Sequence, residues 1–133
     1  MRVLLDTNVL ISAFVFGGAA GRLLEKLFDG DFELLVSDYV EKEFCTKIEE
    51  KWPDKFDQVY SLYKELPFIF CESSSVCEGS LRDPKDIPVL SDALFHQVDV
   101  ILSGDKDFLE ADLEYPLVLS PATMLDFLEK KNR

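Results

Sequence analysis

Two short apolar runs in this chain each lead to an acid. Residues 3–5 lead directly to Asp6, and residues 100–102 lead through Ser103 and a glycine to Asp105. Such runs are typical of buried parallel strands, whose carboxyl ends form the ligand crevice of an open α/β sheet. Carboxylates gathered there repel one another unless a cation neutralises them, and oxygen ligands suit Mg²⁺ or Mn²⁺. The two runs therefore predict an acidic metal site at a sheet edge.

Asp6 has a second interpretation, as the residue that caps the helix expected to follow it. Thr7 and Asn8 could provide that cap instead, which would leave the Asp6 carboxylate available for chemistry. Position alone does not decide between these two roles.

Acids elsewhere in the chain could complete the site. In the helix after the second predicted strand, helical arithmetic puts Glu43 at the edge of the apolar stripe and Glu41 further inside it, and does not choose between them. Asp83 and Asp86 bracket a helix start, where one is expected to cap the helix and the other could point into the crevice. Asp107 adds an acid after the fourth predicted strand.

Other catalytic patterns are weak. His96 is the only histidine and lies late in a predicted helix, which argues against Ser–His–Asp or Cys–His catalysis. The glycine-rich segment 17–21 lacks the lysine and hydroxyl residue that end a phosphate-binding loop. The three cysteines lack the paired spacing of a zinc site, and we interpret them as free thiols.

The basic residues fall into two groups. Arg22 and Lys26 lie one helical turn apart and could contact a phosphate backbone. We interpret the remaining lysines of the middle segment as solvated helix charges: Lys42, Lys47, Lys51 and Lys55.

The composition fits a single globular domain over residues 1–133, with 47% apolar residues. No run reaches the roughly 18 apolar residues of a membrane helix, and the first residues do not form a signal peptide, so we expect a cytoplasmic protein without membrane contact. The net charge of −12 repels nucleic acid at long range unless bound cations or a local group of basic side chains offset this charge. The same charge suits a basic partner.

Strand and helix patterns alternate along the chain. Strands are predicted at 2–6, 32–36, 68–71, 100–103 and 117–119. Helices are predicted between them, including one over 8–15 and one that Ser37 or Asp38 caps and Pro53 ends. This alternation predicts a three-layer α/β/α fold with a central, mostly parallel sheet of about five strands.

Four blocks, taken in order, resemble the PIN-domain family, which includes the toxin nuclease of VapBC toxin–antitoxin pairs and many RNA-processing nucleases. The blocks are 2–10 (RVLLDTNVL), 37–44 (SDYVEKEF), 83–90 (DPKDIPVL) and 100–109 (VILSGDKDFL). The segment 119–127 is also similar to the last strand and helix of the family, so the resemblance covers essentially the whole chain.

The resemblance implies which residues act, and it favours Glu43 over Glu41. The acidic quartet of the family falls on Asp6, Glu43, Asp86 and Asp105. Accessory positions fall on Thr7, Asn8, Ser103 and Asp107, with Ser103 where threonine is more usual. The resemblance further implies a ribonuclease that uses one or two Mg²⁺ or Mn²⁺ ions, a homodimer, and a small basic antitoxin as a possible partner.

Two other classes of function remain compatible with the residues. In a phosphatase or receiver domain Asp6 would be phosphorylated, but Asn8 stands where such phosphatases usually carry a second acid, and Lys106 matches the receiver lysine poorly. In a binding module, a PIN-like scaffold would hold RNA or a protein without cutting it. The presence of all four acids argues against this second alternative.

Overall fold

The computed structural model describes residues 1–72, 86–110 and 116–131. Its centre is a five-stranded sheet in the order β3-β2-β1-β4-β5, and every neighbouring pair of strands is parallel. The strands are β1 (Arg2–Leu5), β2 (Glu33–Ser37), β3 (Ile69–Cys71), β4 (Val100–Leu102) and β5 (Leu117–Leu119). The predicted α/β class and the five-stranded parallel sheet are confirmed.

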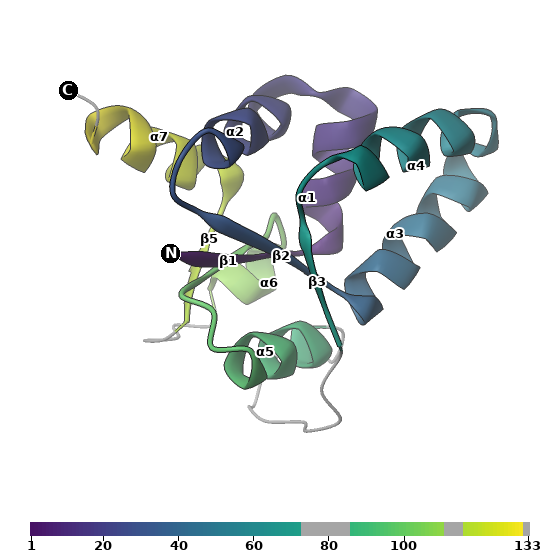
Figure 1. Cartoon of the computed structure of the whole chain (residues 1–133). Helices are drawn as coiled ribbons and strands as arrows, with labels where there is room; N and C mark the ends of the chain where they lie inside the picture. Colours follow the sequence, from purple (N-terminus) through teal and green to yellow (C-terminus); the bar gives the residue numbers. More distant parts are fainter. Residues whose placement is uncertain (73–85, 111–115, 132–133) are drawn as a thin grey trace.

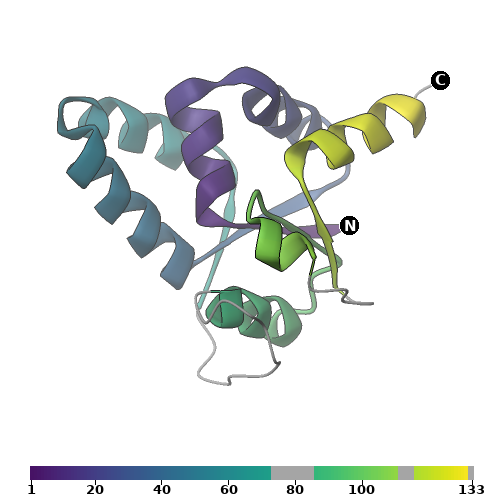
Figure 2. The same cartoon turned by 180° about the vertical axis from the view of Figure 1, so that it is seen from behind.

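Helices cover both faces of this sheet. Figures 1 and 2 show α1, α2 and α7 on one side of the strands and α5 and α6 on the other, with α3 and α4 beyond the β3 side. The longer helices are α2 (Gly18–Phe28), α3 (Asp38–Lys51), α4 (Phe56–Glu65), α5 (Asp86–Phe95) and α7 (Pro121–Lys131). The shorter ones are α1 (Thr7–Ile11), the π-helical turn η1 (Ser12–Phe16), the 3₁₀ turn η2 (Pro53–Lys55) and α6 (Lys106–Leu109).

Strand β1 lies in the middle of the sheet, between β2 and β4. Val3 is in register with Leu34 of β2 and with Val100 of β4. Because both edges of β1 are paired and both of its faces are covered, Val3, Leu4 and Leu5 have no exposed surface. This explains why the segment is a continuous apolar run rather than an alternating one.

Local signals in the sequence fix several helix boundaries. The Ser37 hydroxyl accepts a hydrogen bond from Val40 N at 3.2 Å and so caps α3, and Pro53 follows the end of that helix. The helix predicted over 8–15 is correct in place but is divided into α1 and η1. Gly17 and Gly18 have φ of +74° and +56°, values that favour glycine, and they turn the chain by 103° into α2.

An aromatic cluster lies between the sheet and the α3–α4 pair. Phe44 of α3 lies 5.1 Å from Tyr63 of α4 and 6.0 Å from Phe14, measured between ring centroids, and Phe68 lies 5.4 Å from Tyr63. Phe44 and Tyr63 are almost completely buried. This cluster holds α3, which carries Glu43, against the rest of the molecule.

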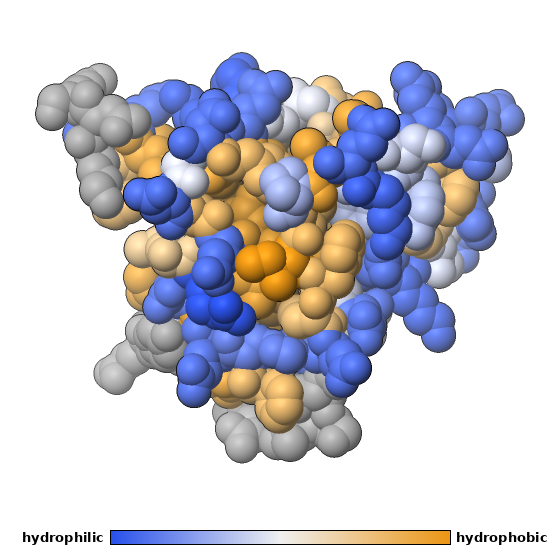
Figure 3. Space-filling view, viewed as in Figure 1, coloured by the Kyte–Doolittle hydropathy of each residue, from blue (hydrophilic) through white to orange (hydrophobic). Residues whose placement is uncertain are grey.

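The sheet has an apolar edge at β3, where Ile69 and Phe70 are 41% and 44% exposed. Figure 3 shows apolar surface in the middle of the side of the molecule seen in Figure 1, bordered by hydrophilic residues.

Within the described ranges, no single helix is long and apolar enough to cross a membrane; only Thr7–Phe16 and Gly18–Phe28 taken together, as a sharply bent pair, reach that length and composition.

Candidate active site

Asp6 lies at the carboxyl end of β1, and its carboxylate is fixed from two sides. Its backbone N donates to Leu102 O at the end of β4, at 2.9 Å. Oδ1 accepts a hydrogen bond from Thr7 N and Oδ2 accepts one from Ser103 Oγ, both at 2.8 Å. Asp6 is therefore itself the cap of α1, which decides the capping role that its position in the sequence left open. The capping oxygen and the oxygen bonded to Ser103 are different atoms.

Ser103 connects the ends of the two central strands. Its hydroxyl donates to Asp6 and accepts a hydrogen bond from Asp105 N at 3.0 Å, and its side chain is completely buried. Asp105 Oδ1 in turn accepts from Phe108 N at 3.4 Å, at the start of α6. One buried hydroxyl thus orients the Asp6 carboxylate and fixes the backbone that carries Asp105.

The electrostatics of Asp6 indicate that negative charges lie near its carboxylate. Burial is the main cause that raises the pKa of Asp6 above its ordinary value, and the negative charges of Glu43 and Asp105 raise it further. The hydrogen bonds from Ser103 and Thr7 act in the opposite direction. Glu43 and Asp105 are therefore close enough to Asp6 to repel its charged form, and a cation among the three would relieve that repulsion.

The two glutamates of α3 have different surroundings. The negative charge of Glu43 raises the pKa of Asp6. Glu43 Oε1 lies 3.9 Å from Nζ of Lys47, one turn further along the helix. Glu41 instead pairs with Lys64 of α4 at 2.9 Å. Helical arithmetic could not separate these positions because it does not include the elements on either side of α3.

Asp86 is the first residue of α5, but its side chain lies outside the part that the structure describes, as do the Asp107 side chain and all of Asp83. Among the described side chains, no group of three His, Cys, Asp or Glu residues is arranged to hold a metal ion together. Asp6, Glu43 and Asp105 are the members of the predicted quartet whose side chains the structure describes.

The chemistry of the available donors fits a hard divalent cation. Asp6, Asp105 and Glu43 offer carboxylate oxygens, which Mg²⁺ and Mn²⁺ prefer. The Thr7 hydroxyl is almost completely buried beside them, and no described residue bonds to it. Mg²⁺ usually keeps several waters in such sites, so direct contact with every acid is not required.

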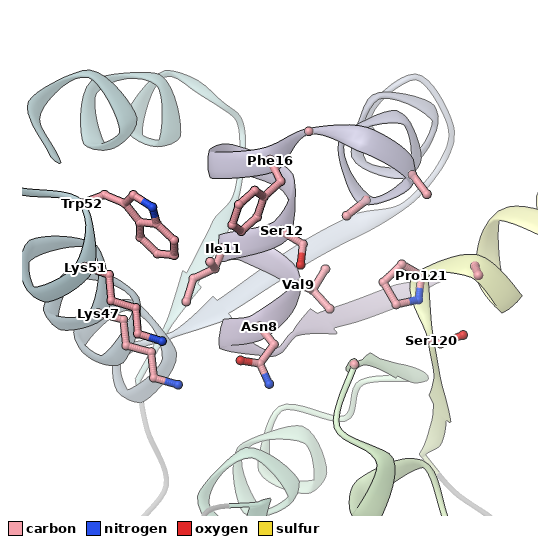
Figure 4. Close-up of a pocket in the computed structure, with 15 residues that line it drawn as sticks. Asn8, Val9, Ile11, Ser12, Phe16, Lys47, Lys51, Trp52, Ser120 and Pro121 are labelled. Atoms are coloured by element: carbon pink, nitrogen blue, oxygen red, sulfur yellow. The ribbon is translucent and has the colours of Figure 1, made fainter. Parts of the chain in front are cut away.

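A groove of about 830 Å³ adjoins these acids. Asn8, which is exposed, and Gly104, next to Asp105, line the part nearest the acids. The groove is also lined by Ile11, Phe16, Lys47, Lys51 and Trp52, which Figure 4 shows between α1, η1 and α3.

The basic residues of this groove differ from those that the sequence suggested. Arg22 and Lys26 are exposed on α2 but are not among the residues that line it. Lys47 and Lys51, which we interpreted as solvated helix charges, do line it. Their four-residue spacing next to the only tryptophan, Trp52, was the available signal.

The raised pKa of Asp6 predicts a specific pH dependence of stability in metal-free protein. The folded state binds a proton at Asp6 at a pH where the unfolded chain has released it, so the free energy of unfolding falls as pH rises from the ordinary value, 3.8, through the raised one. The variant Asp6→Asn lacks this penalty. We expect it to melt higher at pH 7 in chelator, by about 3–5 °C for each kcal/mol recovered.

Differential scanning calorimetry from pH 4 to 8 would measure this difference. The gap between variant and wild type should close toward pH 4, and Mg²⁺ or Mn²⁺ should raise the melting temperature of wild type only. A variant that melts at a lower temperature than wild type at pH 7 would show that the ionised Asp6 carboxylate does not destabilise the folded protein.

Comparisons with known proteins were made for sequence and for structure. The sequence model described as "PIN domain" matches residues 2–107, whereas no curated protein matches the chain. The fold is similar to a chain in the crystal structure of VapBC2 from Rickettsia felis bound to a DNA fragment from their promoter. That match has 15% sequence identity and a TM-score of 0.71, and it covers 90% of this chain and 98% of the other.

The two comparisons support different conclusions. At 15% identity, the structural likeness establishes the fold alone. The sequence match, in contrast, extends over well over half of the 133 residues and includes β1, α3, the start of α5 and β4. The chain therefore belongs to the PIN-domain family.

Proposed function

We propose that this protein is a ribonuclease that hydrolyses RNA phosphodiester bonds with one or two Mg²⁺ or Mn²⁺ ions. The observation that supports this most directly is that Ser103 joins Asp6 to the backbone of Asp105 at the carboxyl ends of β1 and β4, in a member of the PIN-domain family. Glu43 of α3 is a third acid whose charge acts on Asp6. The three acids come from three different elements, and mutual repulsion of this kind is costly unless a cation offsets it.

In this proposal Asp6 and Asp105 would hold the cation, and Glu43 and Asp86 would complete the site, partly through water. When bound, a divalent cation makes water more acidic and offsets negative charge on the phosphate. Ser103 and Thr7 N keep the Asp6 carboxylate in one orientation through their 2.8 Å hydrogen bonds. Glu43, which is partly exposed, would accept the proton of the attacking water, and the departing oxygen would take a proton from solvent. Asn8, which is exposed, would assist, and the family resemblance adds Asp107 as an accessory acid.

We further propose that residues 1–133 form one nuclease domain that works in the cytoplasm as the toxin of a toxin–antitoxin pair or as a related RNA-processing enzyme. The structural neighbour is a VapBC2 assembly, which supports a small antitoxin as a partner. The net charge of −12 suits a basic partner whose cationic side chains enter the acidic site. A homodimer is the oligomeric state that the family resemblance implies.

Cleavage assays with purified protein test the central proposal. A panel of single-stranded and structured RNAs would be incubated with Mg²⁺, with Mn²⁺ and with chelator. We expect cleavage with either metal and none in chelator. Folded protein that binds neither metal and cuts no RNA would contradict the proposal and favour a binding module, and phosphorylation of Asp6 by a small phosphodonor would favour a phosphoryl-transfer domain.

Substitution of Ser103 should weaken cleavage without removing a metal ligand. Ser103→Ala loses the hydrogen bonds to Asp6 Oδ2 and Asp105 N, and loss of such an outer contact typically costs about 10–100-fold in activity or metal affinity. Since the Ser103 bond lowers the pKa of Asp6, the acid limb of the pH–rate profile should also move to higher pH.

Ser103→Thr is the matched control because it keeps the hydroxyl. It should retain most of the cleavage rate and the wild-type pH profile. An alanine variant whose activity falls without any change in the pH profile would indicate that Ser103 acts only on the backbone of Asp105.

A further inference from the structure

The groove beside the acids contains an aromatic pair that the proposed chemistry does not use. Phe16 and Trp52 pack edge to face, with ring centroids 5.6 Å apart and planes at 83°. Phe16 is 70% exposed, so most of its ring surface is open. Figure 4 shows both rings at one end of the groove, above Lys51.

The backbone holds Phe16 in this exposed position through an unusual element. Phe16 is the last residue of the π-helical turn η1, and Gly17, with φ of +74°, turns the chain away directly after it. π-Helical turns are rare and frequently occur at functional sites. The backbone geometry of this turn thus keeps most of the Phe16 ring at the surface, where it can contact a ligand.

The charge of the groove is opposite to that of the whole protein. The sequence contains 26 acids and 14 basic residues, yet the described residues that line the groove include Lys47 and Lys51 and no acid. The two lysines lie four residues apart on one face of α3, and Figure 4 shows both side chains directed into the groove toward Asn8. This local basic track is where a polyanion would meet least repulsion.

We propose that this groove binds a single-stranded segment of nucleic acid that flanks the scissile phosphate, with Lys47 and Lys51 against its phosphates and a base stacked on the Phe16–Trp52 pair. A positive groove combined with aromatic side chains is the arrangement by which proteins bind single strands. Bases inside a duplex are stacked on one another, so only an unpaired base can reach the two rings. The inference rests on the proposed function and assigns substrate-binding roles to residues of this chain that the proposed chemistry does not use.

Trp52 makes the proposal directly measurable because it is the only tryptophan in the chain. A single-stranded RNA oligonucleotide would be titrated into wild type and into Asp6→Asn, both in chelator, while tryptophan emission and binding are recorded. We expect quenching of Trp52 on binding. An abasic oligonucleotide of the same length should bind more weakly and leave the emission unchanged, and duplex RNA should do the same.

Two variants separate the aromatic and the ionic contributions. Phe16→Ala should weaken RNA binding by about 5- to 30-fold, the cost of one stacked base at the lower end of its range. Lys51→Gln should lower the slope of log affinity against log salt by about 0.7, the value for one phosphate contact with a single strand. Phe127→Ala and Lys130→Gln are matched controls, since both residues are exposed and neither lines the groove.

Equal RNA affinity for Phe16→Ala and Phe127→Ala, or quenching by the abasic strand, would overturn the inference. So would an acidic, aromatic peptide that quenches Trp52 where RNA does not, since the groove would then be a protein-docking site. RNA cleavage without Trp52 quenching would overturn this inference alone. Base-dependent quenching in a protein that cuts no RNA with either metal would overturn the nuclease proposal and keep the groove as a single-strand site.

Discussion

Asp6→Asn is expected to lose RNA cleavage by more than about 100-fold, since outer contacts of a metal site already account for 10–100-fold and Asp6 is proposed as a direct ligand. Asparagine has nearly the same shape and keeps an Oδ1 that can accept from Thr7 N, so the cap of α1 should survive. The loss would therefore report the charge of the carboxylate and not the fold.

The measurement is the initial rate of RNA cleavage in saturating Mn²⁺, together with circular dichroism of the variant. Asp57→Asn is the matched control, because Asp57 is exposed on α4 and lies in none of the elements that carry the site acids. The control should cut RNA at the wild-type rate. Full activity of Asp6→Asn would contradict the assignment of this carboxylate as a ligand.

Phe44→Ala is expected to destabilise the protein by about 3–5 kcal/mol, the usual cost of truncating a buried phenylalanine. Phe44 is 1% exposed and lies between Phe14 and Tyr63, so its removal leaves a cavity within the aromatic cluster. Because that cluster holds α3 against the sheet, Phe44→Ala should also displace Glu43, the neighbouring residue in the sequence. The variant should therefore lose part of the RNA cleavage to which Glu43 is proposed to contribute.

Urea unfolding at constant pH measures the change in the free energy of unfolding. Phe127→Ala, which shortens a phenylalanine that is 49% exposed, should change it by less than about 1 kcal/mol. A Phe44→Ala variant as stable as this control would show that the cluster is not a rigid support for α3.

The fold was largely predictable from the sequence because its signals are local. Each strand is a short apolar run, Ser37 caps α3 as its position suggested, and Pro53 follows the end of that helix. The burial of both faces of β1 also follows from an apolar run with no polar alternation, whereas its place in the strand order does not. The division of the helix over 8–15 into α1 and η1 was not predictable, because a π-helical turn depends on tertiary packing that no local pattern records.

The candidate site was predictable only in part. Because the carboxyl ends of parallel strands meet at one edge of a sheet, the sequence predicts that the ends of β1 and β4 lie close together. The structure agrees, since Ser103 Oγ donates a hydrogen bond to Asp6. The choice between Glu41 and Glu43 depends on α4, whose Lys64 pairs with Glu41. Likewise, Lys47 and Lys51 look like ordinary solvated lysines until η1 places Phe16 opposite Trp52. These features arise from contacts between elements far apart in sequence.

The order of strands in the sheet has a consequence for how the protein is made. β1 leaves the ribosome well before its partner β4, which begins at Val100, and Ser103 lies 97 residues beyond Asp6. At about 5–20 residues per second, several seconds of synthesis separate the two halves of the acidic centre. A nascent chain that has not reached β4 can pair β1 with β2 but has no partner for the Asp6 carboxylate. The acidic centre is thus assembled late, so an unfinished chain carries no complete site for the proposed RNA cleavage.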